Sequence, residues 1–376
     1  MIYLDNAATT YPKPPTVREA LLRSISELGG NPGRGGHRLS LAAAEAVYDC
    51  RCSVAALFGI DEPERVIFTA GATAALNLAI KTAIRPGMHV LLSDREHNAV
   101  ARPIYRLADE GVIDYDVYPT TGDVLAEIEA RIRPSTGLLV ACHLSNVTGF
   151  VLPIKEIGAL CHRRGIRFVI DGAGSAGHLP IDLGGIDFDA FCAPGHKGLL
   201  GIAGVGFVIL KNDRGLSDFM DGGSGHSSLS RRMPASLPER YEAGTLPTPA
   251  IVALGAGVDY LRHRDLSAVA AEEATMKARL TEGLLALREI EIFEPKNPYG
   301  PLLFTHPRLR PEAIAEALDR HGVCVRAGYH CAPLAHRTVG SPTGGGVRVS
   351  PAITNRSAEI EEFLRILNRV IREESK

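Results

Sequence analysis

The chain has 376 residues, of which 45% are hydrophobic and 22% charged, and its formal net charge is -2. A chain of this length is long enough for two domains with a large core. The balanced charge and the lack of a Lys/Arg block exclude an extended surface for nucleic acid or anionic membrane, so we expect a small-molecule partner.

The sequence carries no targeting or membrane-spanning pattern. Residues 1–6 lack the basic and apolar stretches of a signal peptide, and no run approaches the ~18 apolar residues of a transmembrane helix. We therefore expect a cytoplasmic protein that does not contact membranes.

The seven cysteines are odd in number and lack framework spacing, which favours reduced thiols over disulfides. Two groups suggest zinc, but neither has the paired C-x-x-C spacing of a structural site: Cys50 with Cys52, and Cys324 with His330, Cys331 and His336. We expect no metal.

Between residues 39 and 210 helical stretches alternate with short apolar runs. This spacing predicts helices at 39–58, 73–84, 98–109, 123–132 and 153–164, and strands at 66–69, 89–92, 114–118, 137–141 and 168–170. Such alternation is typical of an α/β protein with a mainly parallel sheet covered by helices on both faces.

Residues 212–248 break this rhythm with several prolines and the run Gly222-Gly223-Ser224-Gly225, and so long an excursion is usually functional. Beyond it we predict helices at 250–264, 266–287 and 357–371, and strands near 290–293, 302–305, 323–326 and 347–349. The chain therefore divides into a large domain of residues 15–255 and a small C-terminal domain of residues 256–376, joined by the N-terminal segment 1–14.

Lys197 lies where the apolar run 188–192 gives way to a tight turn. Desolvation there lowers the pKa of the ammonium and makes the neutral amine available to attack a carbonyl. Asp171 follows directly after the buried run 167–170. An aspartate paired with the pyridine nitrogen of pyridoxal 5'-phosphate (PLP) keeps that nitrogen protonated, so that the ring can act as an electron sink. Together they predict a PLP site, whereas Lys197 alone is also compatible with a solvated loop cation.

Residues 69–73 follow a strand and open a helix, so the free backbone N–H groups around Ala72, the helix dipole and the Thr73 hydroxyl converge on one point. That point suits the cofactor's phosphate, and His196 beside the lysine strengthens this interpretation. The alternative is that Thr73 only caps its helix.

His97 and Asn146 follow the ends of two predicted strands, at the edge where parallel sheets bind ligands. An imidazole at His97 can stack on the cofactor ring and move protons, and Asn146 can hydrogen-bond the phenolic oxygen. The alternative for both is a loop residue without a function.

Cys331 lies in the turn-rich loop 325–333, and Arg348 follows seventeen positions later. The neighbouring His330, Arg326 and Arg348 favour a thiolate over a thiol. Arg348 offers the planar fork that grips an amino-acid carboxylate with two hydrogen bonds. Taken alone, this pair is also compatible with an inert thiol and a surface arginine.

With these residues in place, the chain resembles the PLP-dependent cysteine desulfurases of the class V aminotransferase-like branch, which also contains selenocysteine lyases. The resemblance runs nearly end to end and implies a fold-type I PLP-dependent transferase with a seven-stranded, mainly parallel sheet and a smaller α/β C-terminal domain. It rests on residues 3–8, 34–37, 71–73, 96–97, 145–146, 171–173, 195–197 and 240–245, and on the Cys331 loop with Arg348.

The resemblance also implies roles for individual residues. It implies a Schiff base on Lys197, a sulfur-accepting Cys331, and a homodimer in which Thr245 and the loop 222–225 reach the neighbour's cofactor. The other implied roles are Asp171 at the pyridine nitrogen, His97 over the ring, Asn146 near the phenolic oxygen and the substrate, Ala72, Thr73 and His196 on the phosphate, and Arg348 on the substrate carboxylate.

Two positions depart from the family pattern. Gly174 stands where the family usually has a glutamine bonded to the phenolic oxygen, and Pro194 stands where it has a phosphate-binding serine or threonine. Each loss removes a bond worth on the order of 1 kcal/mol. We expect weaker PLP retention and an altered Schiff-base pKa, with Ser175 or water as a substitute.

The sequence therefore predicts a cysteine desulfurase that converts L-cysteine to L-alanine, leaves a persulfide on Cys331 and passes the sulfur to an acceptor protein or small thiol. Three alternatives stay open. They are a selenocysteine lyase, another class V PLP aminotransferase, epimerase or lyase, and a non-catalytic PLP-fold partner protein that lost its cofactor through Gly174 and Pro194.

Overall fold

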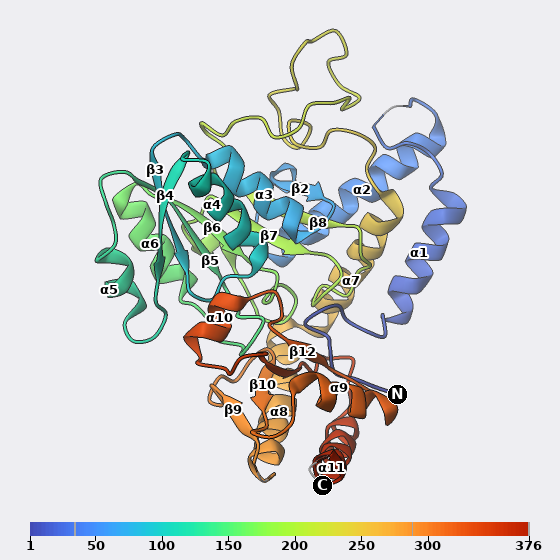
Figure 1. The fold of residues 1–376 in the computed structure, drawn as a ribbon. Helices are drawn as coiled ribbons and strands as arrows, with labels where there is room; N and C mark the ends of the chain where they lie inside the picture. Colours follow the sequence, from blue (N-terminus) through green and yellow to red (C-terminus); the bar gives the residue numbers. More distant parts are fainter. Residues whose placement is uncertain (34, 288, 375–376) are drawn as a thin grey trace.

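The computed structural model describes residues 1–33, 35–287 and 289–374. Arg34, part of the motif at residues 34–37, lies outside the described residues. Within them, the centre is a seven-stranded sheet in the order β2-β8-β7-β6-β5-β3-β4 (Figure 1). Its strands are β2 (Val66–Thr69), β3 (Met88–Ser93), β4 (Ile113–Tyr118), β5 (Thr136–Cys142), β6 (Arg167–Asp171), β7 (Ala190–Pro194) and β8 (Gly206–Leu210).

Strand β8 alone runs antiparallel to its neighbours β2 and β7, whereas the β4-β3-β5-β6-β7 pairs are parallel. The predicted seven-stranded, mainly parallel sheet is therefore confirmed. Its parallel strands end at one common edge, which is where ligands bind in such sheets.

Helices cover both faces of this sheet because successive strand residues point to opposite sides. Val90 and Leu92 of β3 pack under α3 (Ala72–Ala83) and α4 (Asn98–Asp109), whereas Leu91 between them belongs to the opposite core. That opposite core contains residues of α2 (Arg38–Leu57), α5 (Val124–Glu129), α6 (Ile154–Arg164) and α7 (Thr248–Arg264), and α1 (Pro15–Glu27) packs on α7.

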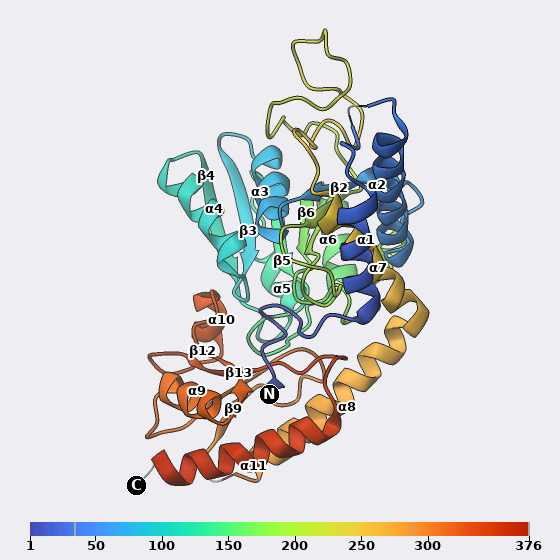
Figure 2. The ribbon, with the colours of Figure 1, turned by 90° about the vertical axis from the view of Figure 1, so that its right-hand side faces the viewer.

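In the described C-terminal part, a four-stranded antiparallel sheet has the order β12-β13-β10-β9. Figure 2 shows α8 (Leu266–Leu285) and α11 (Ser357–Glu374) lying side by side beneath it. The remaining elements here are β9 (Glu291–Phe293), β10 (Leu302–Thr305), α9 (Pro311–Arg320), β12 (Arg326–Gly328), α10 (Pro333–Thr338) and β13 (Gly346–Val349). The predicted boundary between residues 255 and 256 falls inside α7, and the division into two domains stays a prediction.

The predicted strand at 323–326 is two short strands in the structure. β11 (Val323–Cys324) pairs in parallel with β1 (Ile2–Tyr3), whereas β12 pairs with β13. The N-terminal segment is therefore hydrogen-bonded to the C-terminal part of the chain through a separate two-stranded sheet. None of the described helices is long and apolar enough to cross a membrane.

Candidate active site

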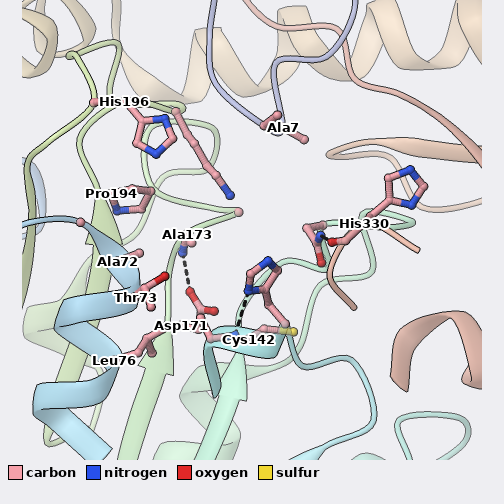
Figure 3. Close-up of a pocket in the computed structure, with 18 of the residues that line it drawn as sticks. Ala7, Ala72, Thr73, Leu76, Cys142, Asp171, Ala173, Pro194, His196 and His330 are labelled. Atoms are coloured by element: carbon pink, nitrogen blue, oxygen red, sulfur yellow. Dashed lines mark hydrogen bonds between the residues drawn. The ribbon is translucent and has the colours of Figure 1, made fainter. Parts of the chain in front are cut away.

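A cavity of about 660 Å³ opens at the carboxyl ends of the parallel strands (Figure 3). It lies between the loops after β3, β5, β6 and β7, the first turn of α3, the N-terminal segment and the small sheet. The cavity brings together every predicted site residue except Cys331 and Thr245. These lining residues are Ala72, Thr73, His97, Asn146, Asp171, His196, Lys197 and Arg348.

Asp171 is the last residue of β6, Lys197 lies in the turn after the neighbouring strand β7, and both line the cavity. Burial lowers the pKa of Lys197 to about 8, which agrees with the direction predicted for a lysine behind a buried strand. Burial raises the pKa of Asp171, while the N–H of Ala173, 2.8 Å from Oδ1, and Lys197 lower it. A carboxylate held in this way suits the protonated pyridine nitrogen of PLP.

The first turn of α3 faces the same cavity from one side, and Figure 3 shows Ala72, Thr73, Pro194 and His196 gathered there. Gly71 is the N-cap and α3 has no side-chain cap, so the Thr73 hydroxyl does not cap its helix. Free N–H groups at a helix start bind phosphate well.

His196 completes this side of the cavity. Burial lowers the pKa of His196 to about 4, so its ring is neutral at pH 7, and Nδ1 is buried without a hydrogen-bond partner among the described residues. A buried polar atom of this kind requires a partner. Because the helix start, the hydroxyl and the ring nitrogen converge, the residues present fit the phosphate of PLP.

His97 is the N-cap of α4, where its Nδ1 accepts a hydrogen bond from the N–H of Ala99 at 3.0 Å. In the neutral ring the proton is therefore on Nε2. Burial, together with Lys197 and Arg326, lowers the pKa of His97 to about 4, so the imidazole is uncharged at neutral pH.

Arg348 is a buried arginine and not a surface one, with 1% of its surface exposed. Its Nη2 lies 2.7 Å from Oδ1 of Asp5, its Nη1 donates to the carbonyl oxygen of Asn146 at 3.1 Å, and its Nε has no partner among the described residues. An unpaired donor on a cavity-lining guanidinium is suited to binding a carboxylate.

Cys331 is exposed beside the cavity and does not line it, although Arg326 and His330 of the same loop do. The Nη2 atom of Arg326 lies 3.5 Å from the sulfur. His330 and Cys331 both have left-handed backbone conformations, with φ of 52° and 56°. Such conformations persist only where the surroundings hold them, which suggests a fixed loop.

The Cys331 loop is held by hydrogen bonds to its backbone and by a buried pair of histidines. Asn146 donates to the carbonyl oxygen of His330 at 2.9 Å, and the N–H of Asn98 donates to that of Cys331 at 2.7 Å. The ring of His330 stacks on His336, with Nδ1 of the first 3.0 Å from Nε2 of the second. No pattern in the sequence predicted this stack.

Thr245 is exposed and lies outside the cavity of its own chain, where the side chain of Asn31 donates to its hydroxyl at 3.2 Å. The loop 222–225 is also absent from the described cavity lining. Their predicted role at a neighbour's cofactor stays a prediction.

The two departures from the family pattern, Gly174 and Pro194, both line the cavity. Ser175 does not replace the missing glutamine, because it is fully buried and its hydroxyl lies 3.0 Å from Nδ1 of His143. No group of three or more His, Cys, Asp and Glu side chains is arranged to hold a metal ion in the described part of the chain.

Comparisons with known proteins agree with this geometry. The aminotransferase class-V family matches residues 2–363. A "probable cysteine desulfurase" of Methanothermobacter thermautotrophicus is 34% identical over 96% of this chain and 92% of its own length, and a cysteine desulfurase of Pectobacterium atrosepticum is 29% identical over 99% and 93%. The apo structure of a cysteine desulfurase from Thermococcus onnurineus superposes with a TM-score of 0.90 at 28% identity, covering 99% of this chain and 95% of that one.

Proposed function

The chain belongs to the aminotransferase class-V family, and from that premise we propose that it is a PLP-dependent cysteine desulfurase that converts L-cysteine to L-alanine. The observation that carries the proposal is one cavity in which Lys197 and Asp171 face Arg348, with the loop of Cys331 forming part of the wall. The desulfurase relatives, aligned over almost their whole length, support the same activity.

The cavity residues fit PLP, which supplies an electron sink for the substrate when it is bound. Asp171 would hold the pyridine nitrogen, the start of α3 with Thr73 and His196 would hold the phosphate, and Lys197 would hold the aldehyde carbon. Because the pKa of Lys197 is about 8, a fraction of its amine is neutral near pH 7 and can take a proton from the substrate's α-carbon.

Arg348 would bind the substrate carboxylate through the N–H groups that the protein leaves unpaired, which orients the amino acid in the cavity. His97 presents a neutral ring whose proton is on Nε2, so that N–H can donate to a substrate atom inside the cavity. Asn146 would connect two parts of the cavity wall, because its carbonyl oxygen accepts a hydrogen bond from Arg348 and its side chain donates one to the Cys331 loop.

Cys331 would accept the sulfur as a thiolate, with the guanidinium of Arg326 beside it as the compensating charge. The thiolate attacks the substrate sulfur, so an S–S bond forms as the C–S bond breaks. The electron pair of the C–S bond remains on the substrate carbon, which gains a proton to give alanine, and the protein keeps a persulfide. An acceptor protein or small thiol in the cytoplasm would then take that sulfur.

We also propose a homodimer in which Thr245 and the loop 222–225 approach the partner's cofactor. Support comes from the position of Thr245, exposed and outside its own cavity. Large apolar side chains are also exposed on α1 and α2, and a second copy would bury them: Leu22, Ile25, Leu39, Leu41 and Tyr48.

The test is to supply PLP and L-cysteine and to measure alanine and sulfide together. Equal amounts of both support a desulfurase, whereas a keto acid in place of alanine would indicate an aminotransferase. Cys331→Ala should keep the yellow cofactor and lose sulfide release. Cys324→Ala is the matched control and should retain it, and L-selenocysteine turnover that survives Cys331→Ala would favour a selenocysteine lyase. A protein that stays colourless with PLP would exclude all three enzymes.

A further inference from the structure

We propose that Asp5 is a positioning residue for the substrate carboxylate, because it holds the guanidinium of Arg348, a side chain that lines the cavity and keeps donors without a protein partner. The inference rests on the proposed function, since it requires an amino-acid substrate whose carboxylate binds Arg348. Asp5 belongs to the N-terminal motif at residues 3–8, to which the proposed reaction assigns no role.

The contacts of Arg348 leave part of its guanidinium without a protein partner. Asp5 engages Nη2 at 2.7 Å, and the carbonyl oxygen of Asn146 engages Nη1 at 3.1 Å. Nε is buried and unpartnered among the described residues, on a side chain that lines the cavity. The protein therefore uses one N–H on each terminal nitrogen, and three of the five guanidinium N–H groups, including Nε–H, are left without a protein partner among the described residues.

Arg348 also needs Asp5 because a second arginine lies next to it. Arg326 and Arg348 are directly opposite each other in the β12–β13 pair, and both line the cavity. Like charges at opposite positions of a strand pair repel one another. Asp5 is the ion-pair partner of Arg348 in the described part of the chain, so its carboxylate offsets that repulsion and compensates the buried charge.

The backbone of Asp5 is itself fixed. Its carbonyl oxygen accepts from the N–H of Ala8 at 3.0 Å, and the residue bridges to Ser350 just beyond β13. Asn6, the next residue, donates from its side chain to the carbonyl oxygen of Ser350 at 2.9 Å. Asp5 is thus attached to the segment that carries Arg348.

Asp5 acts through Arg348 and not on the substrate. Ala7 and Ala8 are among the residues that line the cavity, whereas Asp5 is not. Without the carboxylate, Arg348 keeps its donors but loses the contact that orients them, and the repulsion from Arg326 turns it away. The expected consequence is a weaker hold on carboxylates, with no direct effect on the cofactor.

The experiment titrates PLP-loaded protein with L-alanine and with L-alaninamide, which lacks the carboxylate, and follows the cofactor's absorbance. The parent should bind L-alanine more tightly than the amide. Asp5→Ala should lower the affinity for L-alanine about tenfold and leave that for the amide unchanged. Asp5→Asn keeps an acceptor but loses the charge, so about a threefold loss is expected.

Asn355→Ala is the matched control, because Asn355 anchors the same segment through the carbonyl oxygen of Tyr3 at 2.9 Å without touching Arg348. It should keep the parent's preference. An equal loss in this control, or Asp5 variants that keep the preference within about twofold, would overturn the proposal, as would a parent that binds both ligands equally. If Asp5→Ala does not fold, Asp5→Asn decides by the same criterion. This titration measures no sulfur chemistry. A parent that releases no sulfide from L-cysteine would therefore refute the desulfurase, while the comparison of L-alanine with L-alaninamide would still test the role of Asp5.

Discussion

The carbonyl oxygen of Leu144 occupies the space in which a side chain on Gly174 would begin, because a Cβ atom there would lie 2.4 Å from it. Contacts this short force the backbone to move. We therefore expect that Gly174→Gln does not restore the family's bond to the cofactor. It should lower the free energy of unfolding by about 1–3 kcal/mol and weaken PLP binding, as measured by chemical denaturation and by cofactor titration.

Gly29→Ala is the control for that variant, since a Cβ at Gly29 meets nothing within 4 Å. Its stability should stay within about 0.5 kcal/mol of the parent. A Gly174→Gln protein that is as stable as the parent and binds PLP more tightly would contradict the prediction, because it would show that the backbone at Leu144 moves aside at little cost.

Lys197 makes the stability of the cofactor-free protein depend on pH. Burial lowers its pKa from 10.5 to about 8, so between these values the unfolded chain carries a proton that the folded chain does not. Stability from this group therefore rises with pH from about 8 to 10.5, and below pH 8 its burial costs on the order of 3 kcal/mol.

Lys197→Met should remove this dependence and make the cofactor-free protein more stable at pH 7. Urea denaturation at pH 7 and pH 9.5 measures both effects. Lys155→Met, at an exposed lysine on α6, is the control and should change neither. A Lys197→Met protein whose stability follows the parent's pH curve would contradict a strongly lowered pKa.

His336 supports the loop of Cys331 through the ring of His330. The Nε2 of His330 faces the carbonyl oxygen of Arg326 at 3.1 Å and so carries the proton, which makes Nδ1 the acceptor from His336. His336→Phe removes that donor and leaves a buried acceptor unpaired. We expect a loss of about 1–3 kcal/mol at pH 7, measured by denaturation.

The same variant should also be less sensitive to acid. Burial lowers the pKa of His336 to about 4 and that of His330 to about 3, so as pH falls below 6.5 the unfolded chain binds protons first and stability is lost. Removing one of these groups reduces that loss. His162→Phe, at an exposed histidine, should lose stability with falling pH as steeply as the parent does. If His336→Phe also loses stability as steeply as the parent, the lowered pKa of His336 is refuted.

Sequence patterns identified the parts of this structure that depend on local chemistry. The alternation of helical and apolar runs predicted β2, β3, β4 and β5 because each is short and followed by its own helix. Asp171, Lys197 and Asn146 could be placed together because residues that follow parallel strands meet at one sheet edge.

Contacts between segments that are distant in the sequence could not be predicted in this way, because no local sequence pattern encodes them. The pairing of Asp5 with Arg348 joins positions 343 residues apart, and the split of the predicted strand at 323–326 depends on β1 at the other end of the chain. The His330–His336 stack depends on the turn of α10. The one sequence feature that pointed to Asp5 was its position as a carboxylate inside the motif at residues 3–8.

Leu41→Asp tests the proposed dimer. Leu41 lies on α2 with 59% of its surface exposed, and a charge there would be buried against a second copy. We expect a monomer by light scattering, with weaker PLP binding because the partner's Thr245 is lost. Leu285→Asp is the control on α8, where the leucine is 63% exposed. It should remain a dimer, and a dimeric Leu41→Asp protein would remove α2 from the interface.

Pro194 is the one departure from the family that a substitution should reverse. It ends β7 opposite Gly206, lines the cavity, and offers neither a hydroxyl nor an N–H to the phosphate. Pro194→Ser places a hydroxyl on the side of the cavity where Thr73 and His196 lie. One added hydrogen bond worth about 1 kcal/mol should lower the PLP dissociation constant about fivefold.

Pro194→Ala separates the hydroxyl from the loss of the ring, because both variants regain the N–H and the backbone freedom that proline removes. Equilibrium titration of the cofactor-free proteins with PLP gives the three dissociation constants. Serine should bind more tightly than alanine, and alanine should lie near the parent. Equal constants for serine and alanine would mean that the hydroxyl does not reach the phosphate, and the position of the phosphate beside Pro194 would then be wrong.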